Sequence, residues 1–307
     1  MRRRGLIHSI LEQKKGVEKL NLREQRIRNL FNRETGKAVI IPMDHGIGGV
    51  REGLEDPLGS FQRFVGLCPE ALLMNFGIVK LVQNFIIGAA DPPGVIMAVD
   101  FNHRWHGWKA PIEEKGLLGH CISADVEQAA RYKVDAVKVL FDLGLNPKTQ
   151  LSVFKNISEL VRQCDRHDMP IMIEPLADGL FIPSEKKNHP KIIADGCRIA
   201  LELGADIIKA AYPAEGPETK ELFAAICKNA HVPVVMLGGA KKDSIPEIFQ
   251  IARDGIDAGA KGVIFGRNVW QRPTAEMESV VNGLQDIVHR NAGVQESLSK
   301  YNLPGEK

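Results

Sequence analysis

Short apolar runs alternate with longer segments of helical period along most of the chain. The runs are rich in Val, Ile and Leu, which is typical of strands buried on both faces of a parallel sheet. The runs are AVIIPMD (38–44), EALLMN (70–75), GVIMAVD (94–100), VDAVKVLF (134–141), PIMIE (170–174), ADIIKA (205–210), VPVVML (232–237) and KGVIFG (261–266). Strands of this number, with helices between them in about 250 residues, predict a (β/α)8 TIM barrel.

The segments between the runs carry the complementary pattern. In VEQAARYKV, NISELVRQCDRH, ADGCRIALELG and IPEIFQIARDGIDAG, apolar residues recur every three or four positions, with charged residues between them. Gly204 and Gly259 end two of these segments and are predicted helix C-caps. A doubly wound open sheet is the main alternative, but it more often has about five or six strands. We therefore expect a helical extension over 1–35, the barrel over 36–290 and a loose tail over 291–307.

Composition restricts the partners that the protein can have. The chain is 44% hydrophobic and 25% charged, with a formal net charge of +2, so no global field favours nucleic acid or a membrane. Its five scattered cysteines lack metal or disulfide spacing, and no apolar run approaches the roughly 18 residues of a membrane span. The amino terminus MRRRGLIHSI lacks the features of a signal peptide, and we interpret its arginines as a solvated helix face. We expect a cytoplasmic homo-oligomer.

Unusual polar residues lie near the carboxyl ends of the predicted strands. Asp44, Asp100 and Glu174 close the first, third and fifth strands, while Lys138 and Lys209 interrupt the fourth and sixth. Barrel enzymes carry their chemistry at this end of the strands. Burial and a neighbouring cation lower a lysine pKa, which makes the amine a nucleophile able to form a Schiff base. The alternative is that both lysines are structural, each paired with a carboxylate.

Two glycine-containing loops favour the catalytic interpretation. LGGAKKDS follows the seventh strand with Gly238 and Gly239, and FGRNVWQR follows the eighth with Gly266 and Arg267. The loops after these strands form the frequent phosphate site of barrel enzymes, built from backbone amides and a short helix. Because both loops occur where that site is expected, we predict a phosphorylated sugar or small keto-phosphate substrate.

Four motifs in order carry a family resemblance over about residues 36–285. They are PMDHG…GLEDP (42–57), ADIIKAAYP (205–213), GGAKK (238–242) and GRNVWQ (266–271). The chain resembles the class I, Schiff-base aldolases of the archaeal-type fructose-bisphosphate and tagatose-bisphosphate aldolase superfamily (DeoC/FbaB-like aldolases). The resemblance implies that Lys209 forms the Schiff base, that Asp44 assists carbinolamine and carbon–carbon bond chemistry, and that no cofactor is required. It also implies that the two glycine loops bind phosphate.

One departure from the family pattern concerns the proton shuttle. The fructose-bisphosphate and heptulosonate branch usually ends the fifth strand in YPRG, with the tyrosine as shuttle, whereas this chain reads IEPLADG. The fourth strand reads VKVL, as in the tagatose-bisphosphate and sulfosugar-type aldolases, and there the glutamate is the shuttle. The resemblance thus implies that Glu174 exchanges the proton, while Lys138 holds Glu174 ionised and keeps Lys209 partly unprotonated. Tyr212 is the next candidate for the shuttle.

Other functions stay open from the sequence. His45 and the histidines of HRWHGW (103–108) could indicate a metal-dependent aldolase, but their spacing matches no metal motif, so we expect His45 and His103 to line the substrate pocket and no metal to bind. The same lysine could serve a transaldolase or thiolase-like transfer of the heptulosonate-synthase or autoinducer-phosphate type. A catalytically weak sugar-phosphate sensor is a further alternative.

Overall fold

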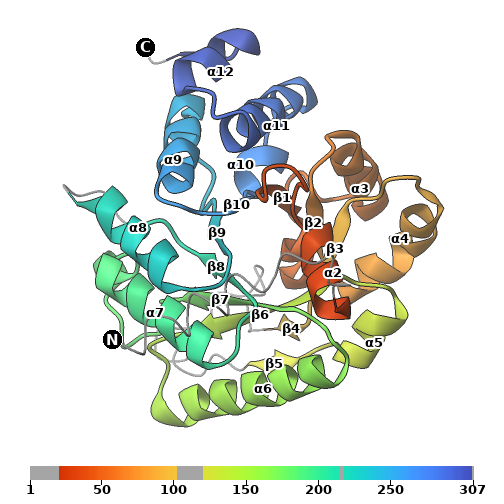
Figure 1. Ribbon diagram of the computed structural model, residues 1–307, viewed down its shortest axis with the longest axis vertical. Coiled ribbons are helices and arrows are strands. Elements are labelled where there is room, and N and C mark those ends of the chain that lie inside the picture. The colour runs from red at the N-terminus through yellow and green to blue at the C-terminus, as the bar shows by residue number, and fades with distance from the viewer. Residues whose placement is uncertain (1–20, 102–119, 214–217, 306–307) are drawn as a thin grey trace, which may run out of the picture.

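Parallel strands close into a barrel in the computed structural model, which describes residues 21–101, 120–213 and 218–305 (Figure 1). In ring order the strands are β1 (Ala38–Pro42), β10 (Gly262–Ile264), β9 (Val234–Leu237), β8 (Ile207–Ala210), β7 (Ile171–Leu176), β6 (Ala136–Asp142), β3 (Gly94–Ala98) and β2 (Ala71–Asn75). Each predicted apolar run forms one of these strands, so the predicted TIM barrel is confirmed.

Helices surround the barrel and shield the outer faces of the strands (Figure 1). They are α3 (Pro57–Gly66), α4 (Phe76–Gly88), α5 (Val126–Arg131), α6 (Pro147–Arg166), α7 (Pro190–Glu202), α8 (Thr219–Asn229), α9 (Ile245–Asp257), α10 (Arg267–Trp270) and α11 (Thr274–His289). The predicted caps Gly204 and Gly259 follow α7 and α9 with φ of +100° and +103°, the left-handed conformation that glycine adopts readily. No helix within the described residues is long and apolar enough to cross a membrane.

Alternation along each strand divides the apolar side chains into two clusters. One cluster, which includes Ala136, Met172 and Ile207, fills the barrel interior, and the other packs between strands and helices. Because side chains two positions apart share a face of a strand, Lys138, Glu174 and Lys209 continue the interior row of those three residues.

A two-stranded antiparallel sheet, absent from the prediction, interrupts the third βα unit. The run GVIMAVD is divided between β3 and β4 (Asp100–Phe101), and β4 pairs with β5 (Cys121–Ile122). Asp100 therefore lies just beyond the barrel strand rather than at its last position.

The helix α2 (Leu22–Asn29) lies at the start of the described chain, near the amino-terminal ends of the barrel strands. None of its residues is buried, but Leu30, which follows it, packs in the barrel interior cluster. The carbonyl of Asn29 approaches Gly94 so closely that a Cβ there would lie 2.5 Å from the carbonyl oxygen. Helical structure in the predicted extension is thus seen over α2, and residues 1–20 lie outside the described part of the chain.

The carboxyl-terminal segment is ordered by contacts with the barrel helices, so the expectation of a loose tail is wrong for this part of it. Residues Val294–Lys300 form α12, which packs against α9 and α11. The buried Asp286 of α11 accepts hydrogen bonds from Lys300 and from the Tyr301 hydroxyl at 2.9 Å. The sequence signal was weak because a helix of seven residues depends on tertiary contacts for its stability.

Candidate active site

A carboxylate lies between two lysine side chains in the mouth of the barrel. Glu174 of β7 places Oε2 2.6 Å from Lys138 Nζ of β6 and Oε1 2.9 Å from Lys209 Nζ of β8. The side chains are 8%, 3% and 6% exposed, respectively. Neighbouring strands thus bring the three together from positions far apart in the sequence, and both lysines share a single carboxylate.

Asp44 and His45 approach this group from the turn after β1. Asp44 begins the 3-10 helix η1 (Asp44–Gly48), and its Oδ2 lies 3.6 Å from Lys138 Nζ. His45 Nδ1 is 3.3 Å from the other carboxylate oxygen, and its ring meets Trp270 edge-on with 5.4 Å between centroids. Asn75, at the end of β2, donates to the Asp44 carbonyl at 2.5 Å. The turn that presents Asp44 is therefore fixed by a hydrogen bond from β2 as well as by the 3-10 helix that it begins.

The charges of these groups shift one another's pKa values. Burial opposes ionisation of Glu174, but the charges of Lys138 and Lys209 outweigh it and lower its pKa to about 2. Burial also opposes the charged form of Lys138, yet Glu174, Asp100 and Asp44 raise its pKa well above the usual value. The pKa of Asp44 is likewise held well below its usual range, against its burial, by His45 and Lys138. At neutral pH the site therefore contains two carboxylates and the Lys138 ammonium.

Asp100 is a further buried carboxylate whose charge acts on Lys138. Its Oδ2 accepts a hydrogen bond from the backbone N–H of Leu140 at 3.0 Å and lies 3.4 Å from His120 Nε2. Both side chains are 1% exposed. Since Asp100 contributes to the raised pKa of Lys138, it acts on the ion cluster through its charge.

The two glycine loops meet beside this cluster. A Cβ at Gly238 would lie 2.8 Å from the Phe265 ring, and one at Gly266 would lie 2.9 Å from Pro42, so both positions exclude larger residues. Gly239 has φ of +67°. Asn268 ties the loops together, because its Nδ2 donates to the Gly238 carbonyl at 2.7 Å and its Oδ1 accepts from Lys242 N at 2.8 Å.

One cavity of about 470 Å³ is lined by ten of the described residues that the sequence singled out for the site. They are Asp44, His45, Asp100, Lys138, Glu174, Lys209, Gly238, Gly239, Gly266 and Arg267. His103, with the rest of HRWHGW, lies outside the described residues. Tyr212 is not among the lining residues. Its ring packs edge-on against Phe223 of α8, and burial raises its pKa to about 12, which makes it a poor proton shuttle.

Several cavity residues were missed by sequence reasoning. Arg51 lines the cavity, and its pKa is lowered by burial and by the charge of Arg267, so two guanidinium groups act on the same region. Lys187 also lines it and forms an ion pair with Asp178 at 3.1 Å, and Asn75 completes the wall near Asp44. Arg51 lies between the two quoted parts of the motif PMDHG…GLEDP (42–57), but only the folded loop shows that it lines the cavity.

Ligand-type side chains do not gather into a metal site within the described residues, where no group of three or more His, Cys, Asp or Glu is suitably placed. His45 instead pairs with Asp44 and Trp270. The expectation that no metal or cofactor takes part stays a prediction.

Comparisons with known proteins agree with the fold and with an aldolase. The sequence profile of the DeoC/LacD family aldolases matches residues 38–272. An uncharacterized aldolase of Saccharolobus solfataricus is 30% identical over 281 residues, which cover 90% of this chain and 97% of that relative. The 2-amino-4,5-dihydroxy-6-oxo-7-(phosphonooxy)heptanoate synthase of Streptomyces griseus is 25% identical and covers 89% and 92% of the two chains. A solved Schiff-base-forming fructose-1,6-bisphosphate aldolase superposes with a TM-score of 0.70 at 25% identity, covering 87% of this chain and all of its own.

Proposed function

The chain belongs to the DeoC/LacD family of aldolases, and we propose that it cleaves a phosphorylated ketose in a reversible aldol reaction through a Schiff base on Lys209. The enzyme class that the sequence predicted, an aldolase and hence a lyase, is confirmed by this membership. The observation that carries the proposal is the placement of Glu174 between Lys138 and Lys209 on neighbouring strands.

The first half of the reaction would use Lys209 as nucleophile. The amine attacks the ketone carbon of the substrate, and loss of water from the resulting carbinolamine forms a protonated imine. Because Lys138 contacts the same Glu174 carboxylate, the attraction between Glu174 and Lys209 is weaker than in an isolated ion pair. Asp44 lies against Lys138 and supplies a second fixed carboxylate for proton transfers at the carbinolamine.

The second half would use Glu174 as the base. The carboxylate accepts the proton of the hydroxyl on the bond-breaking carbon, the carbon–carbon bond cleaves, and its electron pair moves into the imine to form an enamine. An aldehyde leaves. Protonation of the enamine carbon and hydrolysis of the imine then release the second product and restore the lysine. Glu174 suits this role because it remains ionised at neutral pH.

The phosphate would be held by the two glycine loops with Arg267 and Arg51. Backbone amides at Gly238, Gly239 and Gly266 allow a close approach of phosphate oxygens, and a guanidinium group adds charge-assisted hydrogen bonds. The site thus fixes one end of the ketose while the reacting carbons lie over Lys209. Such orientation can contribute several kcal/mol, up to about 7–11, of barrier lowering.

Borohydride trapping tests the nucleophile. With dihydroxyacetone phosphate present, borohydride should inactivate the protein and add a ligand-sized mass to the peptide that contains Lys209. Lys209→Met should abolish both effects, whereas Lys228→Met, at an exposed position of α8, should leave them unchanged. Labelling of a different lysine, or of none, would contradict the proposal.

A transferase reaction on the same lysine is the second candidate, favoured by the similarity to the heptulosonate-type synthase. The two reactions differ in the fate of the fragment that stays on Lys209 after the aldehyde has left: a lyase protonates and hydrolyses it, and a transferase passes it to an acceptor. A screen of phosphorylated ketoses with a coupled triose-phosphate readout, with and without acceptor, separates them. The cytoplasmic location and homo-oligomeric state stay predictions.

A further inference from the structure

The two strands that carry the site lysines each follow the pattern Asp-x-x-Lys, with the aspartate just before the strand and the lysine within it. Asp135 precedes Lys138 by three positions, and Asp206 precedes Lys209 by three positions. Both aspartates lie at the amino-terminal end of the barrel, opposite the cavity. They are partly or largely buried, and burial raises the pKa of each. Their carboxylates need partners at that end, and the partners come from other strands and from α2.

Each aspartate forms two reciprocal hydrogen bonds with a residue at the start of the neighbouring barrel strand, β7 for Asp206 and β3 for Asp135. Asp206 N donates to the Ile171 carbonyl at 2.9 Å, and Ile171 N donates to Asp206 Oδ2 at 2.9 Å. Asp135 and Val95 form the same pair of contacts, each at 2.8 Å. These contacts are the first rungs of the β7–β8 and β3–β6 ladders, so they help to set the register of both strand pairs.

The register connects the first rung of each ladder with the site. In β7 and β8, Met172 pairs with Ile207 and Ile173 with Ile208, so the next rung places Glu174 opposite Lys209. In β3 and β6 the paired residues run up to Ala98 and Lys138. Movement of a strand at its first rung would therefore shift its lysine relative to Glu174.

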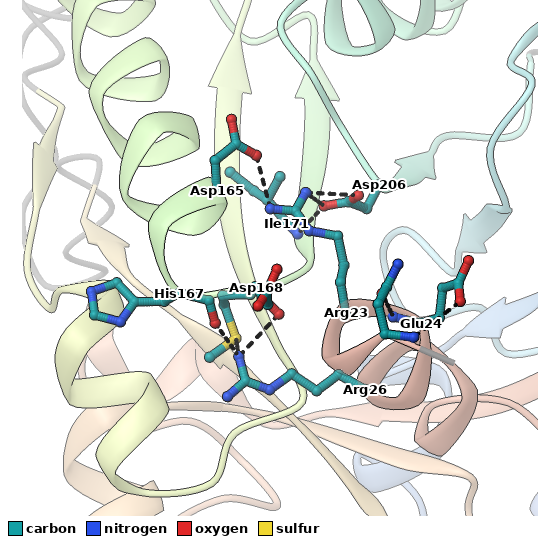
Figure 2. A network of polar contacts seen from close by, with 10 residues as sticks. Arg23, Glu24, Arg26, Asp165, His167, Asp168, Ile171 and Asp206 are labelled. Atoms are coloured by element: carbon teal, nitrogen blue, oxygen red, sulfur yellow. Dashed lines mark hydrogen bonds and ion pairs between the residues drawn. The ribbon is translucent and has the colours of Figure 1, made fainter. Parts of the chain in front are cut away.

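The helix α2 holds both aspartates. Arg23 Nη1 contacts the two carboxylate oxygens of Asp206 at 3.1 Å each, and its Nη2 reaches Asp165 of α6 at 2.8 Å (Figure 2). Asn29 Nδ2 donates to Asp135 Oδ1 at 2.9 Å. No residue of α2 is buried, so polar contacts rather than an apolar face attach this helix to the barrel.

A third carboxylate of the same type has a different partner. Glu70, before β2, accepts from Val39 N at 2.8 Å, but its other oxygen lies 3.2 Å from His289 of α11. The two strand carboxylates that α2 contacts are therefore those on the strands of Lys138 and Lys209, and its third carboxylate partner, Asp165, belongs to α6. This distribution favours a role for α2 in placing the two lysines, rather than a role in merely covering the amino-terminal end of the barrel.

We infer that α2 acts as a clamp in which Arg23 and Asn29, through Asp206 and Asp135, fix the register that places Lys209 and Lys138 around Glu174. Arg23 and Asn29 are thus positioning residues, which act through the strands and do not touch substrate. The inference rests on the proposed function for its meaning in catalysis, but the placement of the lysines can be measured without turnover.

Arg23→Ala tests the clamp, and Arg26→Ala is the matched control. Arg26 lies on the same helix, but its hydrogen bonds go to the carbonyls of His167 and Asp168 and the sulfur of Met169 (Figure 2). Its charge acts on Asp135, but it makes no hydrogen bond to Asp206, so it is a control for the Lys209 strand. At a temperature where both variants are folded, Arg23→Ala should lower kcat and the borohydride trapping rate by about ten-fold, with KM within about two-fold. Arg26→Ala should leave both rates within about two-fold. Arg23→Lys, which restores the charge but not the two-point contact, should recover part of the loss.

Acetylation of Lys209 by acetic anhydride, mapped by mass spectrometry, provides the readout that is independent of catalysis. A shifted strand weakens the ion pair with Glu174, so Lys209 should acetylate several-fold faster in Arg23→Ala but not in Arg26→Ala. If Arg23→Ala does not fold, Asn29→Ala should show the same acetylation effect at Lys138. Unchanged acetylation and kcat in a folded Arg23→Ala, or equal effects in both arginine variants, would overturn the clamp. Failure of the wild type to be trapped would instead refute the aldolase mechanism, and acetylation would still test the clamp.

Discussion

Glu174→Gln is the substitution that separates imine formation from carbon–carbon bond cleavage. Glutamine keeps the size of the side chain and can still accept a hydrogen bond, but it cannot exchange a proton and carries no charge. In the native site the carboxylate accepts from Lys138 at 2.6 Å and from Lys209 at 2.9 Å. The change therefore removes the base and also the carboxylate that both lysine side chains contact.

The size of the effect follows from the two roles. A general acid–base group contributes about 10²–10⁴-fold, so kcat should fall by this factor, which corresponds to about 2.7–5.4 kcal/mol of barrier height. Imine formation should change by less than about ten-fold, because Lys209 keeps its place on β8 and its amine can still attack the ketone. The pKa of Lys138, which Glu174 raises, should fall.

The assay compares turnover with trapping in one preparation. Turnover is followed by the coupled triose-phosphate readout, and imine formation by borohydride inactivation with saturating dihydroxyacetone phosphate. Glu185→Gln, at an exposed position of the 3-10 helix η3 (Ser184–Lys186), is the control and should match the wild type in both assays. Normal turnover of Glu174→Gln would refute the assignment of the proton shuttle. Loss of trapping to the level of Lys209→Met would show that Glu174 serves the imine step instead.

The remaining predictions concern the phosphate site, metals and acid. Arg267→Ala removes a charge-assisted contact of about 1.5–3 kcal/mol, so substrate affinity measured by titration should fall about 10- to 100-fold while trapping at saturating ligand persists; unchanged affinity would show that the loop is misassigned. Activity should survive exhaustive EDTA treatment, and zinc-dependent recovery of a chelated enzyme would make His45 a ligand candidate. The depressed pKa values of Glu174 and Asp44 stabilise the fold fully above the ordinary carboxyl range, and this contribution is lost as pH falls from about 4.5 towards 2. Urea unfolding across this range should therefore show a shallower pH dependence for Glu174→Gln than for the wild type.

The strand pattern shows what the sequence determined by itself. Each apolar run could be recognised locally, because a strand buried on both faces must be apolar throughout and the helices between strands carry their own period. The place of Lys138, Glu174 and Lys209 near the carboxyl ends of the runs, where barrel enzymes carry their chemistry, was also readable. The glycine loops after β9 and β10 were also readable, since they follow the two strands after which barrel enzymes frequently bind phosphate.

Other features depended on residues distant in the sequence. The small β4–β5 sheet, the ordered α12 and the position of Arg51 in the cavity were not predicted, because each depends on contacts with partners far along the chain. A short helix such as α12 has too few internal hydrogen bonds to be recognised without those contacts.

The tertiary structure alone decided how the lysines share their counter-ion. The sequence indicated that Lys138 and Lys209 lie near each other, but it could not show that Glu174 contacts both within 3 Å. Such distances depend on the register of β6, β7 and β8, which is set by backbone hydrogen bonds between strands and by carboxylates at their amino-terminal ends. Hydrophobic periodicity specifies which face a side chain takes, whereas register is a property of the closed barrel, because the strands must satisfy their hydrogen bonds around the whole ring at once.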